Sequence, residues 1–109
     1  MEEMTKLQEL SFEIIGRVGE AKTFAYEALN AAKNNDRNTF EAKMLEAESA
    51  INEAHKIQFQ LLQLENSGKL ETDKFSMIAV HGQDHLMTVM SQIEVFKEIG
   101  ELYLLFDKK

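Results

Sequence analysis

The chain has 109 residues and a formal net charge of −7 at pH 7, and it contains neither cysteine nor proline. This length fits one domain over 1–109, and the absence of cysteine excludes disulfides, thiol catalysis and thiolate metal sites. The negative charge argues against nucleic acids and anionic membranes as partners, because both attract clustered basic residues. No apolar run approaches the roughly 18 residues that span a bilayer, and the acidic N-terminus is unlike a signal peptide. We therefore expect a cytoplasmic protein without direct membrane insertion.

Three long helices are predicted, over about 3–33, 38–66 and 75–107, because good helix formers such as Ala, Leu, Glu, Lys, Gln and Met dominate these segments. The first connection is expected at 34–38, which reads Asn-Asn-Asp-Arg-Asn. The second begins near Gly68, a residue suited to the left-handed position after a helix end. Short connections make neighbouring helices antiparallel. The predicted fold class is all-α, an antiparallel three-helix bundle.

The first two segments carry apolar side chains at alternating steps of three and four residues, which is typical of a buried helix face. Asn38 and Glu41 have the spacing of a capping box at the start of the second helix. Gly16 and Gly19 are expected to mark a bend or a close helix–helix approach in the first. The predicted core residues of the two helices are Leu7, Leu10, Ile14, Ala21, Phe24, Ala28, Ala31, Phe40, Met44, Ala47, Ile51, Ala54, Ile57, Leu61 and Leu64.

The third segment carries two adjacent stripes, which together make a wider apolar surface than two partner helices of the same chain usually cover. We therefore expect self-association. The first stripe is apolar at both ends and polar in the middle, where a bundle core would favour Leu or Ile. It contains Ile78, His81, His85, Thr88, Gln92, Val95, Ile99, Leu102 and Phe106. The second contains Ala79, Gly82, Leu86, Val89, Ile93, Phe96, Gly100 and Tyr103.

His81, Asp84 and His85 have the spacing i, i+3, i+4, which places them on one side of a helical turn. Three chemistries suit this cluster: metal coordination, general acid–base catalysis, and nucleophilic attack by a neutral imidazole on a phosphoryl group. A structural alternative is a polar layer that fixes the register of the bundle. His55 lies apart in the second helix, as a partly buried, hydrogen-bonded residue or as a neighbour of this polar layer.

The segment 80–88, Val-His-Gly-Gln-Asp-His-Leu-Met-Thr, resembles the signature of the lactose/cellobiose-type enzyme IIA of the bacterial sugar phosphotransferase system. Further matches extend the resemblance over nearly the whole chain. They are Phe-Glu-Ile-Ile at 12–15, Gly-Glu-Ala-Lys at 19–22, Glu-Ala-Leu at 27–29, Glu-Ala-His-Lys at 53–56 and Ile-Gly-Glu-Leu-Tyr at 99–103.

The resemblance implies a three-helix subunit that assembles as a homotrimer, a bundle of nine helices. It implies that His81 accepts a phosphoryl group from the phosphorylated general phosphocarrier protein HPr and passes it to a cysteine of enzyme IIB during sugar uptake. It also implies that three copies of Asp84 meet at the trimer axis around one divalent cation, taken as Mg²⁺. Gln83 and His85 match family positions near the active-site groove between subunits. Three buried carboxylates would indeed repel one another without a cation, and oxygen ligands suit a hard ion.

Two other functions suit a small helical protein with this cluster. One is a non-catalytic helical adaptor, and the other is the histidine phosphotransfer domain of a two-component relay, usually a monomeric four-helix bundle. Lys22 stands where many members of the resembled family have Arg. A lysine lacks the guanidinium fork with which an arginine can form two parallel hydrogen bonds to one partner. The sequence leaves open the transported sugar, the phosphorylated ring nitrogen, the identity and occupancy of the metal, and the roles of His55 and Lys22.

Overall fold

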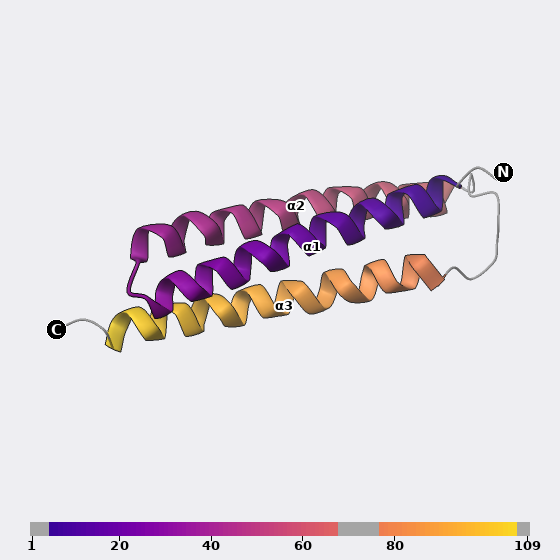
Figure 1. Cartoon of the computed structure of the whole chain (residues 1–109). Coiled ribbons are helices and arrows are strands. Elements are labelled where there is room, and N and C mark those ends of the chain that lie inside the picture. Colours follow the sequence, from indigo (N-terminus) through magenta and orange to yellow (C-terminus); the bar gives the residue numbers. More distant parts are fainter. Residues whose placement is uncertain (1–4, 68–76, 107–109) are drawn as a thin grey trace.

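The computed structural model describes residues 5–67 and 77–106. These form three helices: α1 (Lys6–Lys33), α2 (Arg37–Ser67) and α3 (Met77–Phe106). Figure 1 shows that α1 and α3 run in the same direction and that α2 runs in the opposite one. The described residues contain no strand, so the prediction of an all-α three-helix subunit is confirmed. None of these helices combines the length and the apolar character needed to cross a membrane.

The helix α1 begins at Lys6, because Thr5 caps it. The backbone N–H of Gln8 donates to Thr5 Oγ1 at 3.1 Å, and the Gln8 side chain accepts from the Thr5 backbone N–H at 3.1 Å. This reciprocal pair is a capping box, and it satisfies two donors that a helix start leaves unpaired. The sequence prediction placed the start three residues earlier because the Thr5–Gln8 pair was missed.

The turn between α1 and α2 is shorter than predicted. Asn35 adopts a left-handed conformation with φ of 59°, which Asn tolerates better than most residues. Asp36 then caps α2, because its carboxylate accepts the backbone N–H of Thr39 at 3.1 Å. Hydrogen bonds from Thr39 also lower the pKa of Asp36. The predicted capping box of Asn38 and Glu41 is therefore wrong, and both residues lie inside α2. Gly68 lies outside the described residues.

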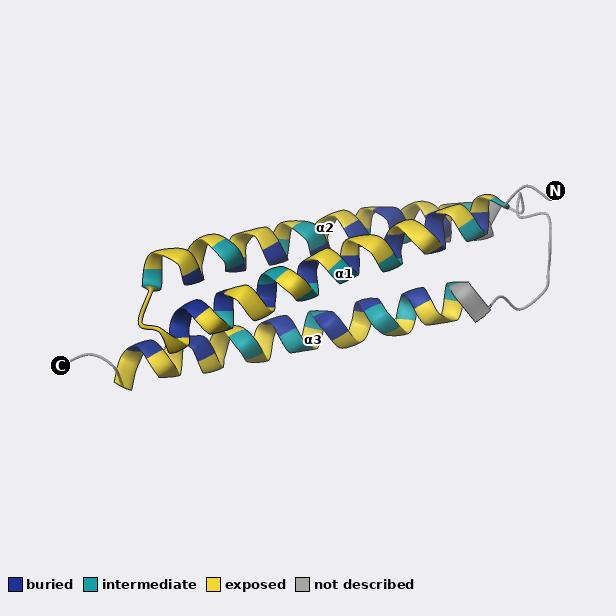
Figure 2. Ribbon diagram, viewed as in Figure 1, coloured by how far each residue is buried: buried dark blue, intermediate teal, exposed yellow. Residues whose placement is uncertain are grey.

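The core lies between the facing stripes of the three helices, where Figure 2 shows the buried residues. Phe24, Leu64, Ala79 and Phe96 are only partly buried against it, and the other core residues predicted for the first two helices are buried. The second stripe of α3 supplies its buried face through Leu86, Val89 and Ile93. The core residues are Leu7, Leu10, Ile14, Val18, Ala21, Ala25, Ala28, Ala31, Ala32, Phe40, Met44, Ala47, Ile51, Ala54, Ile57, Leu61, Leu86, Val89, Ile93 and Leu104.

Two glycines of α3 permit close contacts with the other helices. A Cβ atom on Gly82 would lie 3.4 Å from the carbonyl oxygen of Ser11 in α1. A Cβ atom on Gly100 would overlap the buried ring of Phe40, with Cζ only 2.7 Å away. At Gly16 and Gly19, in contrast, a Cβ atom would meet no atom within 4 Å. Among residues 5–67 and 77–106 of one chain, α1 therefore makes no close helix–helix approach at Gly16 or Gly19.

We predict that Gly100→Ala destabilises the fold by about 1–3 kcal/mol, because the added methyl group displaces the buried Phe40 ring. Gly16→Ala is the matched control, and it should be neutral or stabilising by up to about 1 kcal/mol through helix propensity. Urea unfolding followed by circular dichroism measures both effects. Equal stabilities for the two variants would contradict the packing described for Gly100.

Candidate functional site

The outward face of α3 combines Asp84 with large exposed apolar side chains. Successive residues of an α-helix are turned by about 100°, so Val95 and Leu102 lie within about 20° of the Asp84 direction. Leu102 is 52% exposed and Phe106 is 78% exposed. No other described residue of the chain buries this face, whereas the opposite face of α3 forms the core. The exposed apolar residues of α3 are Val80, Met87, Val95, Ile99, Leu102, Tyr103, Leu105 and Phe106.

His81 and His85 form a stacked pair on one flank of this face. Their ring centroids are 5.8 Å apart, and the ring planes differ by 5°. His81 is exposed, whereas His85 is partly buried. Burial, followed by the charges of His81 and of Lys22 from α1, lowers the pKa of His85. The pair therefore combines an accessible imidazole with a neighbour that favours its neutral form near pH 7.

Gln83 lies on the other flank. Its side-chain oxygen accepts a hydrogen bond from Nε2 of Gln58, which belongs to α2. Viewed along the axis of α3, the side chains of His81 and His85 are rotated from that of Asp84 by about 60° and 100° in one direction. The Gln83 side chain is rotated by about 100° in the opposite direction. Within one chain the structure thus brings His81 and His85 together, leaves Asp84 outward, and separates Gln83 from both. Sequence reasoning missed Gln58, since its partner depends on how α2 and α3 face each other.

A metal site made by one chain is not formed. The described residues contain no group of three or more His, Cys, Asp or Glu side chains placed to hold an ion. His81, Asp84 and His85 therefore do not act together as ligands within a subunit.

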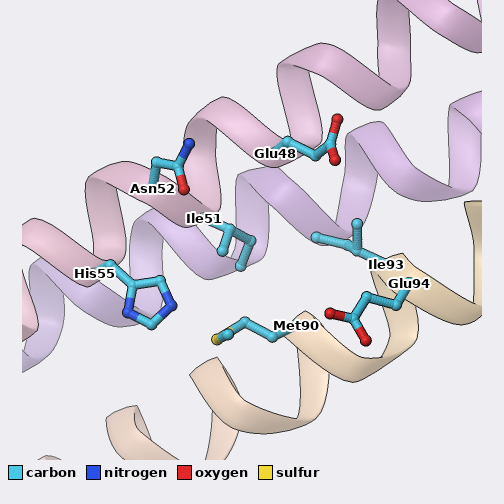
Figure 3. Close-up of a pocket in the computed structure, with 7 residues that line it drawn as sticks. All are labelled: Glu48, Ile51, Asn52, His55, Met90, Ile93 and Glu94. Atoms are coloured by element: carbon cyan, nitrogen blue, oxygen red, sulfur yellow. The ribbon is translucent and has the colours of Figure 1, made fainter.

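His55 belongs to a different surface of the molecule. It lines a pocket of about 220 Å³ between α2 and α3 (Figure 3). Met90 and Glu94 reach this pocket from α3, on the flank that also carries Gln83. His55 is therefore a neighbour of α3, but not of the His81–His85 stack. The other lining residues are Glu48, Ile51, Asn52 and Ile93.

The sequence matches the family model described as PTS system, lactose/cellobiose-specific IIA subunit, over residues 9–104. The chain belongs to the lactose/cellobiose-specific IIA family. The resemblance read from the motif around His81 is thus confirmed, and this IIA chain is a component of a sugar phosphotransferase system.

Individual relatives agree with this assignment. The lactose-specific EIIA component of Staphylococcus epidermidis is 41% identical over 98 residues, which cover 90% of this chain and 92% of the relative. The crystal structure of the cellobiose-specific enzyme IIA from Bacillus anthracis superposes with a TM-score of 0.87 at 36% identity, covering 96% of this chain and 94% of that one. The IIA(chitobiose)–HPr complex of Escherichia coli contains a chain with a TM-score of 0.78 at 34% identity, covering 99% and 100%.

The lowered pKa of His85 predicts a pH dependence of stability. The unfolded chain takes up a proton at His85 near the ordinary value of 6.5, whereas the folded chain does so only at lower pH. Stability contributed by neutral His85 is therefore fully present above this value and is lost as the pH falls from 6.5 towards the folded pKa. We expect His85→Gln to lose less stability than the wild type between about pH 7.5 and 5.5.

Urea unfolding midpoints across this pH range test the prediction. Lys22→Gln removes one of the three causes of the shift, and it should give an intermediate pH dependence. The same decline in wild type and His85→Gln would contradict the assignment.

Proposed function

We propose that this IIA chain accepts a phosphoryl group from phospho-HPr on His81 and passes it to a cysteine of enzyme IIB. The observation that carries the assignment is the position of His81, an exposed imidazole inside the family motif and stacked on a partly buried second histidine. Exposure is required because two different proteins must reach the same ring nitrogen in turn. The complex of the chitobiose relative with HPr supports the choice of donor.

The chemistry consists of two displacements at phosphorus. In the first, the lone pair of a neutral His81 nitrogen forms a P–N bond, while the bond to the donor breaks and its electron pair leaves with the donor. In the second, the IIB thiolate forms a P–S bond, and the P–N electron pair returns to His81. Neutral His85 packs against the His81 ring and restricts its movement. Because His85 carries no positive charge in this form, charge repulsion does not disfavour the stacking of the two rings.

The other functions considered for this chain are less well supported. A non-catalytic adaptor needs no exposed histidine, and family membership marks the chain as a phosphotransferase component with a phosphohistidine intermediate. The described residues form three helices rather than the four typical of a histidine phosphotransfer domain. We also place the IIA chain in the cytoplasm, as its composition and charge led us to expect.

The assembly that best suits the exposed face of α3 is a homotrimer around Asp84. Parallel packing of three α3 helices would cover Val95 and Leu102, which point in the same direction as Asp84. It would also bring three carboxylates together, and their mutual repulsion requires a cation or protonation. Mg²⁺ suits an all-oxygen ligand set of this kind. We therefore propose one Mg²⁺ per trimer, held by the three copies of Asp84.

We predict that His81→Ala abolishes labelling of the chain by phospho-HPr, because no other nitrogen replaces the accepting atom. His55→Ala, which removes a histidine from the separate α2–α3 pocket, is the matched control and should be labelled normally. Phosphopeptide mapping of the wild type should place the label on the tryptic peptide 75–97, which contains His81 and His85. Labelling that survives in His81→Ala, with a retained fold, would refute the assignment.

The metal proposal has a separate test. Adding Mg²⁺ should stabilise the wild-type trimer by roughly 3 kcal/mol when the ion is at a hundredfold excess over its Kd. Thermal unfolding with and without a chelator measures this effect, and analytical ultracentrifugation measures the mass. Asp84→Leu should remove the dependence on Mg²⁺. A wild-type trimer indifferent to both Mg²⁺ and chelator would rule out the shared ion.

A further inference from the structure

Lys22 of α1 and Glu94 of α3 carry opposite charges that the described part of one chain leaves unpaired. Neither residue forms an ion pair with another of residues 5–67 and 77–106. Lys22 is partly buried, whereas Glu94 is exposed. A charged group that loses part of its hydration is stabilised by a partner of opposite charge. Lys22 therefore suits pairing with a group outside its own chain.

Glu94 lines the pocket between α2 and α3 (Figure 3). Its side chain is rotated by only about 20° from that of Gln83, so it points to the flank of α3 that faces α2. The pocket also contains His55 and the carboxylate of Glu48, which is paired with Lys97 at 3.5 Å. Among the described residues, Glu94 is therefore the carboxylate of this pocket that lacks a cationic partner.

Lys22 lies on the opposite side of α3 from this pocket. The helix α1 packs against the flank of α3 that carries His85, because Tyr26 of α1 contacts Phe96. The Phe96 side chain is rotated by only about 20° from that of His85. Lys22 precedes Tyr26 by about one helical turn, so α3 itself separates Lys22 from Glu94 of the same chain.

The two residues nevertheless lie at nearly the same height. The helices α1 and α3 run in the same direction (Figure 1), and the ring centroids of Tyr26 and Phe96 are 4.9 Å apart. Lys22 is therefore level with about Gln92, which is within about 3 Å of Glu94 along the helix axis. A cyclic assembly packs one flank of each subunit against the opposite flank of the next. Rotation about an axis parallel to α3 preserves height, so Lys22 of one subunit faces Glu94 of the next.

We propose that Lys22 of one subunit forms an ion pair with Glu94 of the next, beside the pocket that contains His55. This inference rests on the proposed trimer, and it names the group that the pocket receives, a lysine side chain of a second copy of this chain. The pair is separate from the phosphorylation site, because Glu94 lies about 20 Å from His81 along α3. Charge complementarity across an interface contributes more to specificity and register than to affinity. The pair would thus select the assembly in which unlike flanks of α3 meet.

Cross-linking tests the contact, because the chain contains no cysteine and introduced thiols react alone. A Lys22→Cys/Glu94→Cys chain treated with a short bis-maleimide should give covalent trimers on denaturing gels, since each subunit becomes linked to both neighbours. A link between the two positions of one chain would give monomers only. Lys56→Cys/Glu94→Cys is the matched control. Lys56 is exposed on α2, and this variant should give no covalent trimer.

Charge reversal tests the electrostatic contribution. Lys22→Glu should raise the dissociation constant of the trimer by roughly tenfold or more, because it places like charges opposite each other at every subunit boundary. Glu94→Lys should have a similar effect, and the double reversal should restore assembly, because it recreates the pair with the charges exchanged. Lys56→Glu makes the same charge change at an exposed position and should assemble like the wild type. Sedimentation equilibrium measures the dissociation constants, and circular dichroism confirms that each variant is folded.

The outcomes separate the claims. A trimeric double-cysteine variant that gives no covalent trimer would overturn the pairing of Lys22 with Glu94. A double reversal that assembles no better than either single reversal would also overturn it. A wild-type chain that sediments as a monomer would refute the proposed trimer and this pair with it. Failure of phospho-HPr to label His81 would instead refute the phosphocarrier function and would leave both results on the pair unchanged.

Discussion

The rotation of α3 about its own axis determines where every functional side chain of this protein points. Gly100 against Phe40 sets that rotation, because this contact leaves no room for a Cβ atom, and the buried Gly82 packs against Ser11 on the same side of α3. Contacts between Tyr26 and Phe96, whose ring centroids are 4.9 Å apart, continue the same packing along α1. Once α3 is seated in this way, helical geometry directs Asp84 outward, the histidine stack to one flank and Gln83 to the other.

This seating leaves the outward side of α3 uncovered by the described residues of a single chain. The side of α3 that faces away from the core carries large apolar residues, and a face of this size is rarely left in water. The carbonyl oxygen of the Gln92 side chain is also buried without a hydrogen-bond donor among the described residues. The described part of a single chain thus keeps apolar surface on α3, which favours further assembly through this helix.

Much of the fold follows from the sequence, because long amphipathic segments without proline specify helices strongly. The helix starts were harder to predict. The capping pair of Thr5 and Gln8 was missed, and Asn38, which has the capping-box spacing to Glu41, lies two residues beyond the true cap Asp36. The direction of Gln83 could not be read from spacing in the motif. Neighbouring positions on a helix differ by about 100°, so adjacent motif residues serve different surfaces. Only the partner helix, through Gln58, shows which surface Gln83 belongs to.

A phosphoryl carrier must give up the group that it accepts. Binding the phosphoryl group strongly in the carrier state would lower the energy of that state without helping the next transfer. His85, which stacks against His81, favours its neutral form and so adds no positive charge that would hold the phosphoryl group more strongly.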